Sequence, residues 1–215
     1  EPVQLMAVDW SPDGRLLAVG SSTGVYFYDT QTWQEVRFIP TSVMASEVLF
    51  SFDSQLVGAG YQSRSGGGQL VEVWRVVDGA LAYTMRDLGT VFAASPREGL
   101  WAVRTVEGIS LRSTNDGQEV RRMPLHTRDV PLRMVFSPNG ELLAVSADDG
   151  SIGMWRVADG SLVSVVPGYG ETEEYISGPW RAIAFAPDGQ TLAAGAPDDL
   201  MVLWNSSDGG MRRQV

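Results

Sequence analysis

The chain repeats one pattern along its whole length, and this repetition limits its possible folds more than any other feature. The segment VDWSPDGRLLAVG at 8–20 returns as VFSPNGELLAVS at 135–146 and as IAFAPDGQTLAAG at 183–195, with weaker copies at 48–60 and 92–103. The small residues that open the turn inside each copy follow one another at steps of 40 to 49 residues: Ser11, Ser51, Ser95, Ser137 and Ala186. A period of this length predicts one supersecondary unit repeated five times.

Each repeat reads as four short β-strands. In the fourth repeat, the runs PLRMVF, LLAVSA, SIGMWRV and SLVSVV are separated by SPNGE, DDG and ADG. These separators are turn sequences, because glycine adopts positive φ and Asp or Asn side chains bond nearby backbone groups. The runs are too short and too often interrupted by glycine for helices. The sequence therefore predicts an all-β fold with almost no helix.

Large apolar residues mark the end of the third strand in each unit: Tyr28, Trp74, Leu111, Trp155 and Trp204. One four-stranded sheet cannot bury both of its faces, so the units are expected to stack side by side. The tryptophans expected to pack between units or inside them are Trp10, Trp74, Trp101, Trp155 and Trp204. Trp33 stands in a turn where other units have Asp-Gly, and Trp180 precedes an inner strand, so both are expected to be exposed.

The order of these motifs, with SPDG or SPNG first, then LLAVSADDGSIGMW, then DG before the last strand, resembles the WD-repeat propellers, particularly the bacterial kind. The resemblance covers essentially all 215 residues and is weaker in units two and three. It implies a β-propeller of four-stranded antiparallel blades at about 1–40, 41–88, 89–126, 127–168 and 169–215. Five repeats fit a complete five-bladed ring or part of a larger, seven-bladed propeller. Pairing with a second chain is a third possibility, because open sheet edges seek partners.

Composition excludes several classes of function. The chain has 26 acidic and 16 basic residues, and a net charge of −10 repels phosphate backbones and anionic lipid surfaces. No apolar run approaches the about 18–20 residues that a membrane-spanning helix needs. The chain has no cysteine, so disulfides and thiolate zinc sites are absent, and no cofactor is implied. No signal peptide is evident, and the compartment stays open, with the cytoplasm slightly favoured over export.

The resemblance also assigns a role to the single histidine. In the family, a histidine before a repeat bonds a Ser or Thr on the second strand, an Asp in the next turn and the Trp that ends the third strand. The matching residues here are His126, Ser146, Asp149 and Trp155. The set looks like a catalytic triad, but Ser146 does not stand in the G-x-S-x-G elbow that exposes a catalytic serine. The expectation is a structural hydrogen-bonded tetrad and a protein that is not an enzyme.

In the family, partners commonly dock where the inner strands begin. The matching positions are Met6, Ala7, Ser46, Glu47, Thr90, Val91, Leu132, Arg133, Arg181 and Ala182. Two loops, 61–69 and 168–180, are longer than the family pattern. The second carries aromatic residues that are expected at the surface. The predicted residues for binding a protein or peptide partner are Glu47, Arg133, Tyr169, Tyr175, Trp180 and Arg181.

These features favour a protein-interaction scaffold or sensor module. One alternative is a carbohydrate-binding propeller, which would need an aromatic platform in pockets between blades. A weaker alternative is a hydrolase that uses carboxylates on the inner strands, where Asp9 and Glu47 are the only acidic residues. Calcium binding is disfavoured because no DxDxDG run is present.

Overall fold

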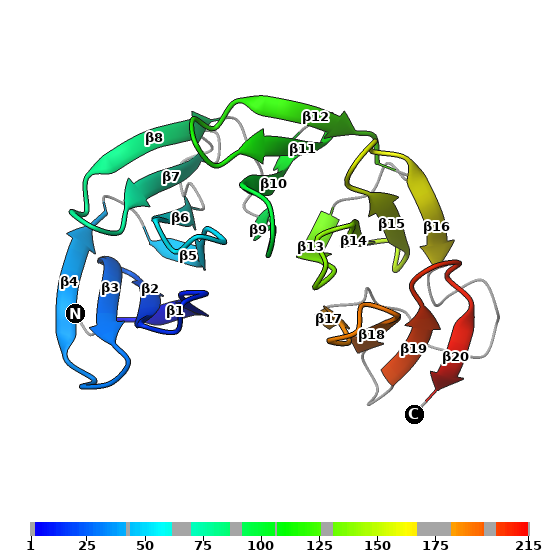
Figure 1. The fold of residues 1–215 in the computed structure, drawn as a ribbon, viewed down its shortest axis with the longest axis horizontal. Coiled ribbons are helices and arrows are strands. Elements are labelled where there is room, and N and C mark those ends of the chain that lie inside the picture. Colours follow the sequence, from blue (N-terminus) through cyan, green and yellow to red (C-terminus); the bar gives the residue numbers. More distant parts are fainter. Residues whose placement is uncertain are drawn as a thin grey trace. The chain divides into compact units, whose positions relative to one another are not determined.

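The computed structural model describes residues 3–41, 44–61, 70–86, 92–105, 107–125, 131–166, 182–195 and 201–214. In these ranges the chain forms twenty β-strands joined by turns, arranged as five four-stranded sheets (Figure 1). The prediction of an all-β fold built from five four-stranded repeats is confirmed. Among the described residues, no helix is long and apolar enough to cross a membrane.

We number the sheets as blades 1 to 5 in chain order. Blade 1 contains β1 (Leu5–Trp10), β2 (Leu16–Ser21), β3 (Gly24–Asp29) and β4 (Glu35–Pro40). Blade 2 contains β5 (Ala45–Phe50), β6 (Leu56–Tyr61), β7 (Leu70–Arg75) and β8 (Leu81–Arg86). Blade 3 contains β9 (Phe92–Ala94), β10 (Leu100–Thr105), β11 (Gly108–Ser113) and β12 (Glu119–Met123). Blade 4 contains β13 (Pro131–Phe136), β14 (Leu142–Ala147), β15 (Ile152–Arg156) and β16 (Leu162–Val166). Blade 5 contains β17 (Ala182–Phe185), β18 (Thr191–Gly195), β19 (Met201–Asn205) and β20 (Met211–Gln214).

The chain forms two compact units, and the boundary between them runs through blade 3. The first unit comprises Glu1–Val106 and Ser110–Val120, and the second comprises Glu107–Ile109 and Arg121–Val215. Each unit has its own clusters of buried apolar side chains.

The turn between the first two strands of a blade is held by its own side chains. In blade 1, Ser11 Oγ donates to Asp13 Oδ1 at 2.6 Å and accepts the N–H of Leu16 at 2.8 Å. In blade 4, Ser137 Oγ donates to Asn139 Oδ1 at 2.7 Å and accepts the N–H of Leu142 at 2.9 Å. The repeated SPDG and SPNG sequences are therefore hairpin turns whose serine and acidic or amide residue satisfy the backbone locally.

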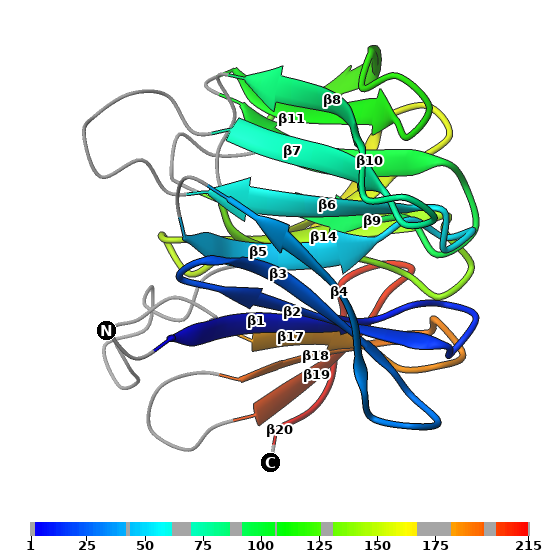
Figure 2. The ribbon, with the colours of Figure 1, turned by 90° about the vertical axis from the view of Figure 1, so that its left-hand side faces the viewer.

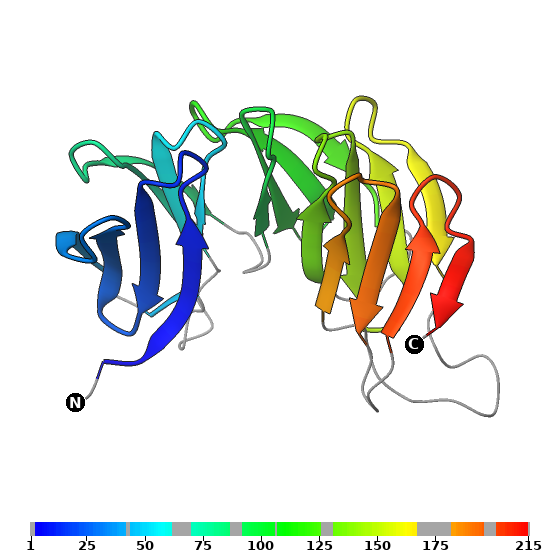
Figure 3. The same cartoon turned by 60° about the horizontal axis from the view of Figure 1, so that its bottom comes forward.

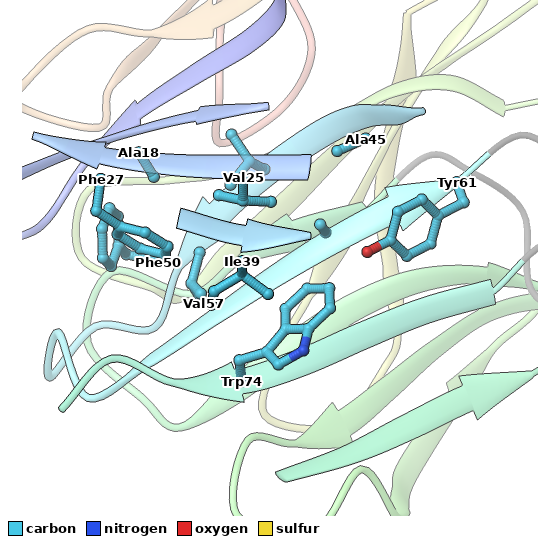
Figure 4. Close-up of a cluster of buried hydrophobic side chains, with 11 residues drawn as sticks. Ala18, Val25, Phe27, Ile39, Ala45, Phe50, Val57, Tyr61 and Trp74 are labelled. Atoms are coloured by element: carbon cyan, nitrogen blue, oxygen red, sulfur yellow. The ribbon is translucent and has the colours of Figure 1, made fainter. Parts of the chain in front are cut away.

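In the first unit, blades 1 and 2 share one hydrophobic core. Phe27 and Ile39 of blade 1 pack against Phe50, Val57 and Trp74 of blade 2, as Figure 4 shows. The rings of Phe27 and Phe50 meet edge to face at 6.1 Å. Figure 2 shows β5 lying beside the strands of blade 1. We call the face that a blade packs on the following blade its forward face, and the face that it packs on the preceding blade its rear face.

Blades 4 and 5 repeat this arrangement in the second unit. Met154 on the forward face of blade 4 belongs to one buried cluster with Leu192 and Trp204 on the rear face of blade 5, and Phe185 packs against that cluster. Figure 3 shows the strands of blade 5, β17 to β20, side by side in orange to red. The third-strand tryptophan is thus a rear-face residue that is buried by the preceding blade.

Blades 2 and 3 are joined in the first unit by Tyr83 on β8. Its hydroxyl donates to the carbonyl of Thr114 at 2.6 Å and accepts the indole N–H of Trp101 at 2.9 Å. Burial raises the pKa of Tyr83 to about 12, so the hydroxyl keeps its proton at neutral pH. Trp101 itself is fully buried, with 0% of its surface exposed.

The structure sorts the described tryptophans as predicted, with one exception, and Trp180 lies outside the described residues. Trp74, Trp101, Trp155 and Trp204 are buried, and Trp33 is 58% exposed. The prediction for Trp10 is wrong, because this side chain is 51% exposed. It lies on the rear face of blade 1.

Candidate functional site

The inner strands of three blades begin with a β-bulge at one common place. The register with the second strand shifts between Leu5 and Ala7, between Ala45 and Glu47, and between Pro131 and Arg133. A bulge leaves one extra residue unpaired and turns the neighbouring side chains in a new direction. In these three blades the docking positions predicted from the sequence therefore coincide with a local irregularity of the backbone, which the sequence pattern did not reveal. In blade 5, Ala182 pairs with Gly195 without such a shift.

The residue that follows the bulge differs in chemistry from blade to blade. It is Ala7 in blade 1, Glu47 in blade 2 and Arg133 in blade 4, opposite Gly20, Gly60 and Ser146 respectively. Glu47 is half-buried and Arg133 is exposed. The two belong to different units, and the structure describes each within its own unit.

The other predicted partner-binding residues, Tyr169, Tyr175, Trp180 and Arg181, lie outside the described residues. The same holds for most of the two long loops. Their assignment to a binding surface stays a prediction.

Three of the four predicted tetrad residues are described. Ser146 and Trp155 are buried in β14 and β15, and Asp149 is exposed in the turn between them. Asp149 Oδ1 accepts the N–H of Ser151 at 2.8 Å and the hydroxyl of Ser151 at 2.5 Å. The buried Ser146 hydroxyl has no hydrogen-bond partner within the described ranges. His126 lies outside them, so the tetrad stays a prediction.

Asp9 has a role that the sequence could not settle. Its Oδ2 accepts the backbone N–H of Phe50 at 2.7 Å, so it braces the inner strand of blade 1 against that of blade 2. Burial raises the pKa of Asp9 above its ordinary value of 3.8, and the hydrogen bonds from the Phe50 and Trp10 amides offset part of the rise. A carboxylate engaged in this way acts as a structural link between two blades.

The raised pKa of Asp9 gives a pH-dependent prediction. The folded state holds the Asp9 proton more tightly than the unfolded state, so the contribution of Asp9 to the free energy of unfolding falls as pH rises from 3.8 through the folded pKa. Asp9→Asn keeps an acceptor for the Phe50 amide and removes the charge. We expect the variant to gain stability relative to the parent protein as pH rises from 3 to 7, measured by urea unfolding at each pH.

Asp13→Asn is the matched control, because its effect on the free energy of unfolding should change with pH in the opposite direction. The Ser11 hydroxyl and the Arg15 amide lower the pKa of the exposed Asp13 carboxyl. Its ionised form therefore adds stability above pH 3.8 that is lost in acid. Asp13→Asn should lose stability relative to the parent as pH rises, and parallel curves for the two variants would contradict the assignment for Asp9.

A second surface, on the rear face of blade 1, is prominent in the structure and was missed from the sequence. Val8, Trp10, Trp33 and Val36 are all more than half exposed there. The Trp10 and Trp33 rings meet edge to face at 6.0 Å. The sequence signal for this surface was the tryptophan at 33 in a turn where other units have glycine.

The described residues contain no cluster of three or more His, Cys, Asp or Glu side chains arranged to hold a metal ion. The residues after the bulges are small or singly charged, and the rear face of blade 1 exposes apolar and aromatic side chains. Such surfaces are suited to binding other polypeptides.

Comparison with known families gives a match to the family described as WD domain, G-beta repeat. The matched segments are residues 2–29, 117–156 and 171–205. They fall on blade 1, on the stretch from β12 to β15, and on blade 5. A comparison with curated proteins gives no significant match.

Solved structures with the same fold are numerous. One is the crystal structure of the computationally designed Ika8 protein, which matches with a TM-score of 0.76 and 18% sequence identity over 98% of this chain. The chain spans 61% of the length of that protein. At this identity the likeness concerns the fold alone. WD40 domains generally bind proteins and are generally not catalytic. The three family matches show WD repeats in this chain, and the five four-stranded sheets have the blade architecture of a β-propeller.

Proposed function

We propose that the chain is a non-catalytic protein-interaction scaffold whose recognition residues lie where the inner strands begin. The observation that carries the proposal is the repeated bulge at this place in blades 1, 2 and 4. The backbone there is the same in each blade, while the side chain after the bulge is Ala7, Glu47 or Arg133. A repeated backbone feature that carries a different side chain in each blade is the arrangement expected of recognition positions.

Arg133 is the strongest single candidate for a partner contact. Its side chain is exposed, and arginine is enriched among residues that dominate binding energy at protein interfaces. Glu47, Tyr169, Tyr175, Trp180 and Arg181 complete the proposed set. We expect Arg133→Glu to weaken partner binding about tenfold or more, because it reverses the charge at an interface position.

The test is site-specific photo-crosslinking in the cells that make the protein. A photoreactive residue at position 133 should give discrete crosslinks to a partner polypeptide, identified by mass spectrometry. The matched control carries it at Glu141, which is also exposed but lies in the turn at the opposite end of the same hairpin. Equal crosslinking at both positions, or none at 133, would contradict the proposal.

A further inference from the structure

The turn between the first two strands of a blade, its inner turn, has an unusual sequence in blade 2. It reads SFDSQ, where blades 1, 4 and 5 have SPDGR, SPNGE and APDGQ. Phe52 stands where the other four blades carry proline, and Ser54 stands where blades 1, 4 and 5 carry glycine. The turn keeps its local bond, because Ser51 Oγ donates to Asp53 Oδ1 at 2.6 Å. The two unusual residues therefore leave the turn intact and change what it presents to its surroundings.

Ser54 joins this turn to the inner turn of blade 1. Its hydroxyl accepts the backbone N–H of Asp13 at 3.1 Å. The backbone of Ser54 has a φ of 60°, close to the 73° of Gly14 in blade 1, although this region is unfavourable for a residue with a side chain. A glycine forms the turn without that strain but has no hydroxyl to accept the bond. The serine therefore links the inner turns of blades 1 and 2 directly.

Phe52 lies against the inner turn of blade 3. A Cβ atom added at Gly99 would lie 3.6 Å from Cε1 of Phe52, which is ordinary van der Waals contact. Proline makes the corresponding contact in blade 4, where Cδ of Pro138 would lie 3.7 Å from a Cβ atom added at Gly189. Phe52 is nevertheless 38% exposed. Phenylalanine therefore keeps the contact between turns and adds an aromatic ring that is partly open to solvent.

The turn between the last two strands, the outer turn, adds a second exposed apolar side chain at the same end of blade 2. Val77 is 75% exposed there. The matching residues of the other blades are Gln31, Asn115, Ala158 and Ser207. The N–H of Val76 donates to the carbonyl of Gln55 at 2.8 Å, so the outer and inner turns of blade 2 are bonded to each other. We call the surface formed by Asp13, Phe52, Asp53, Gln55 and Val77 the turn platform.

Two exposed carboxylates belong to the turn platform. They are those of Asp13 and Asp53, and each accepts a serine hydroxyl of its own turn at 2.6 Å, which holds it in place. The Ser11 hydroxyl and the Arg15 amide lower the pKa of Asp13, so its carboxyl is ionised at neutral pH. The Arg15 side chain is 82% exposed and its Nε lies 3.9 Å from the Asp13 carboxylate, so their pairing is weak. The turn platform therefore combines exposed apolar surface with negative charge.

We propose that the turn platform binds a segment of a partner polypeptide in which an arginine is flanked by apolar residues. The guanidinium stacks on the exposed part of Phe52 and bonds the carboxylate of Asp53, while an apolar neighbour of the arginine covers Val77. Arginine suits this place better than lysine, because its planar group stacks on an aromatic ring and also bonds a carboxylate. The turn platform lies at the opposite end of the blades from the start of the inner strands, so it is a second site, separate from that of the proposed function.

The probe for this site is the capped peptide Gly-Leu-Arg-Leu-Gly, titrated into the isotope-labelled 215-residue chain and followed by NMR shifts of the backbone amides. We expect saturable shifts in the turns at 13–15, 51–55 and 76–79, and weaker binding as salt is added, because salt screens exposed charges. A second peptide carries citrulline, which has nearly the same shape as arginine and no charge, and it should bind more weakly. Absence of saturable shifts in these turns, or equal binding of the two peptides, would overturn the proposal.

The repeats of the chain itself supply variants that preserve the turn. Phe52→Pro introduces the residue of the other four blades, and Asp53→Asn copies Asn139 of blade 4, which accepts its serine hydroxyl in the same way. Each should raise the dissociation constant of the arginine peptide about 2- to 5-fold, the range for an exposed cation–π contact or ion pair. Asp188→Asn is the matched control, because it makes the same change in the inner turn of blade 5, where Pro187 replaces the aromatic residue. It should leave peptide binding unchanged.

Two further outcomes would also count against the proposal. Equal effects of Asp53→Asn and Asp188→Asn would show that the peptide responds to general negative charge and not to the turn platform. Shifts in the same turns on raising the protein concentration alone would assign the platform to an arginine of a second copy of this chain and not to a different partner. Circular dichroism and the urea midpoint check that each variant is folded, and the citrulline comparison needs no variant at all.

Discussion

Trp101→Ala should lower the free energy of unfolding by about 3–5 kcal/mol, the range for truncating a large buried aromatic side chain. Trp101 is completely buried on β10, and its indole N–H donates to Tyr83. The variant therefore opens a cavity and also removes one partner of the hydroxyl that joins blade 2 to blade 3. Urea unfolding followed by tyrosine and tryptophan fluorescence, with circular dichroism as a second probe, measures the loss.

Trp10→Ala is the matched control for this prediction, because it makes the same chemical change at an exposed position. We expect it to cost less than about 1 kcal/mol, since more than half of the Trp10 side chain is already in water. Similar losses in the two variants would show that Trp10 is covered in solution by another part of the protein.

Gly24→Ala has the second largest expected effect. Gly24 begins β3 with a φ of 156°, and a Cβ atom there would lie 2.2 Å from the carbonyl oxygen of Ile39 on β4. Backbone atoms cannot move aside as the end of a flexible side chain can, so β3 and β4 must separate at this point. We expect a loss of about 2–4 kcal/mol in the free energy of unfolding, from overpacking together with backbone strain.

Gly14→Ala separates the steric part of this effect from the conformational part. Gly14 also has positive φ, at 73°, but a Cβ atom there would meet nothing within 4 Å. Its substitution should cost about 1 kcal/mol, from backbone conformation alone. If Gly14→Ala were as destabilising as Gly24→Ala, the close approach to Ile39 would not be the cause.

The repeat pattern was sufficient to predict the number of sheets, the number of strands in each and the burial of most tryptophans. The reason is physical: the SPDG turns and the third-strand aromatic residues act locally, through hydrogen bonds over a few residues and through burial on one face of a sheet. The side chains of Ser11 and Asp13, for example, bond within their own turn. Such features are readable in a single sequence.

The docking positions and the exposed surface of blade 1 were harder to predict. The bulges before Glu47 and Arg133 depend on the register between two strands, and sequence spacing alone does not specify that register. Trp10 was assigned to the core because it occupies a repeat position, and the structure buries Phe50 at the same position in blade 2. Burial of a rear face requires a neighbour, and the sequence of a repeat does not state whether it has one.

The sequence by itself determined the repeated unit, the turns and the side of each strand that is apolar, because these follow from local chemistry and from the two-residue period of a strand. The tertiary structure decided which side chains join one blade to the next. Asp9 bonds the amide of Phe50, Tyr83 links Trp101 to Thr114, and Arg37 packs against Gly79, all across tens of residues. Only the packing of one sheet on another brings these groups together.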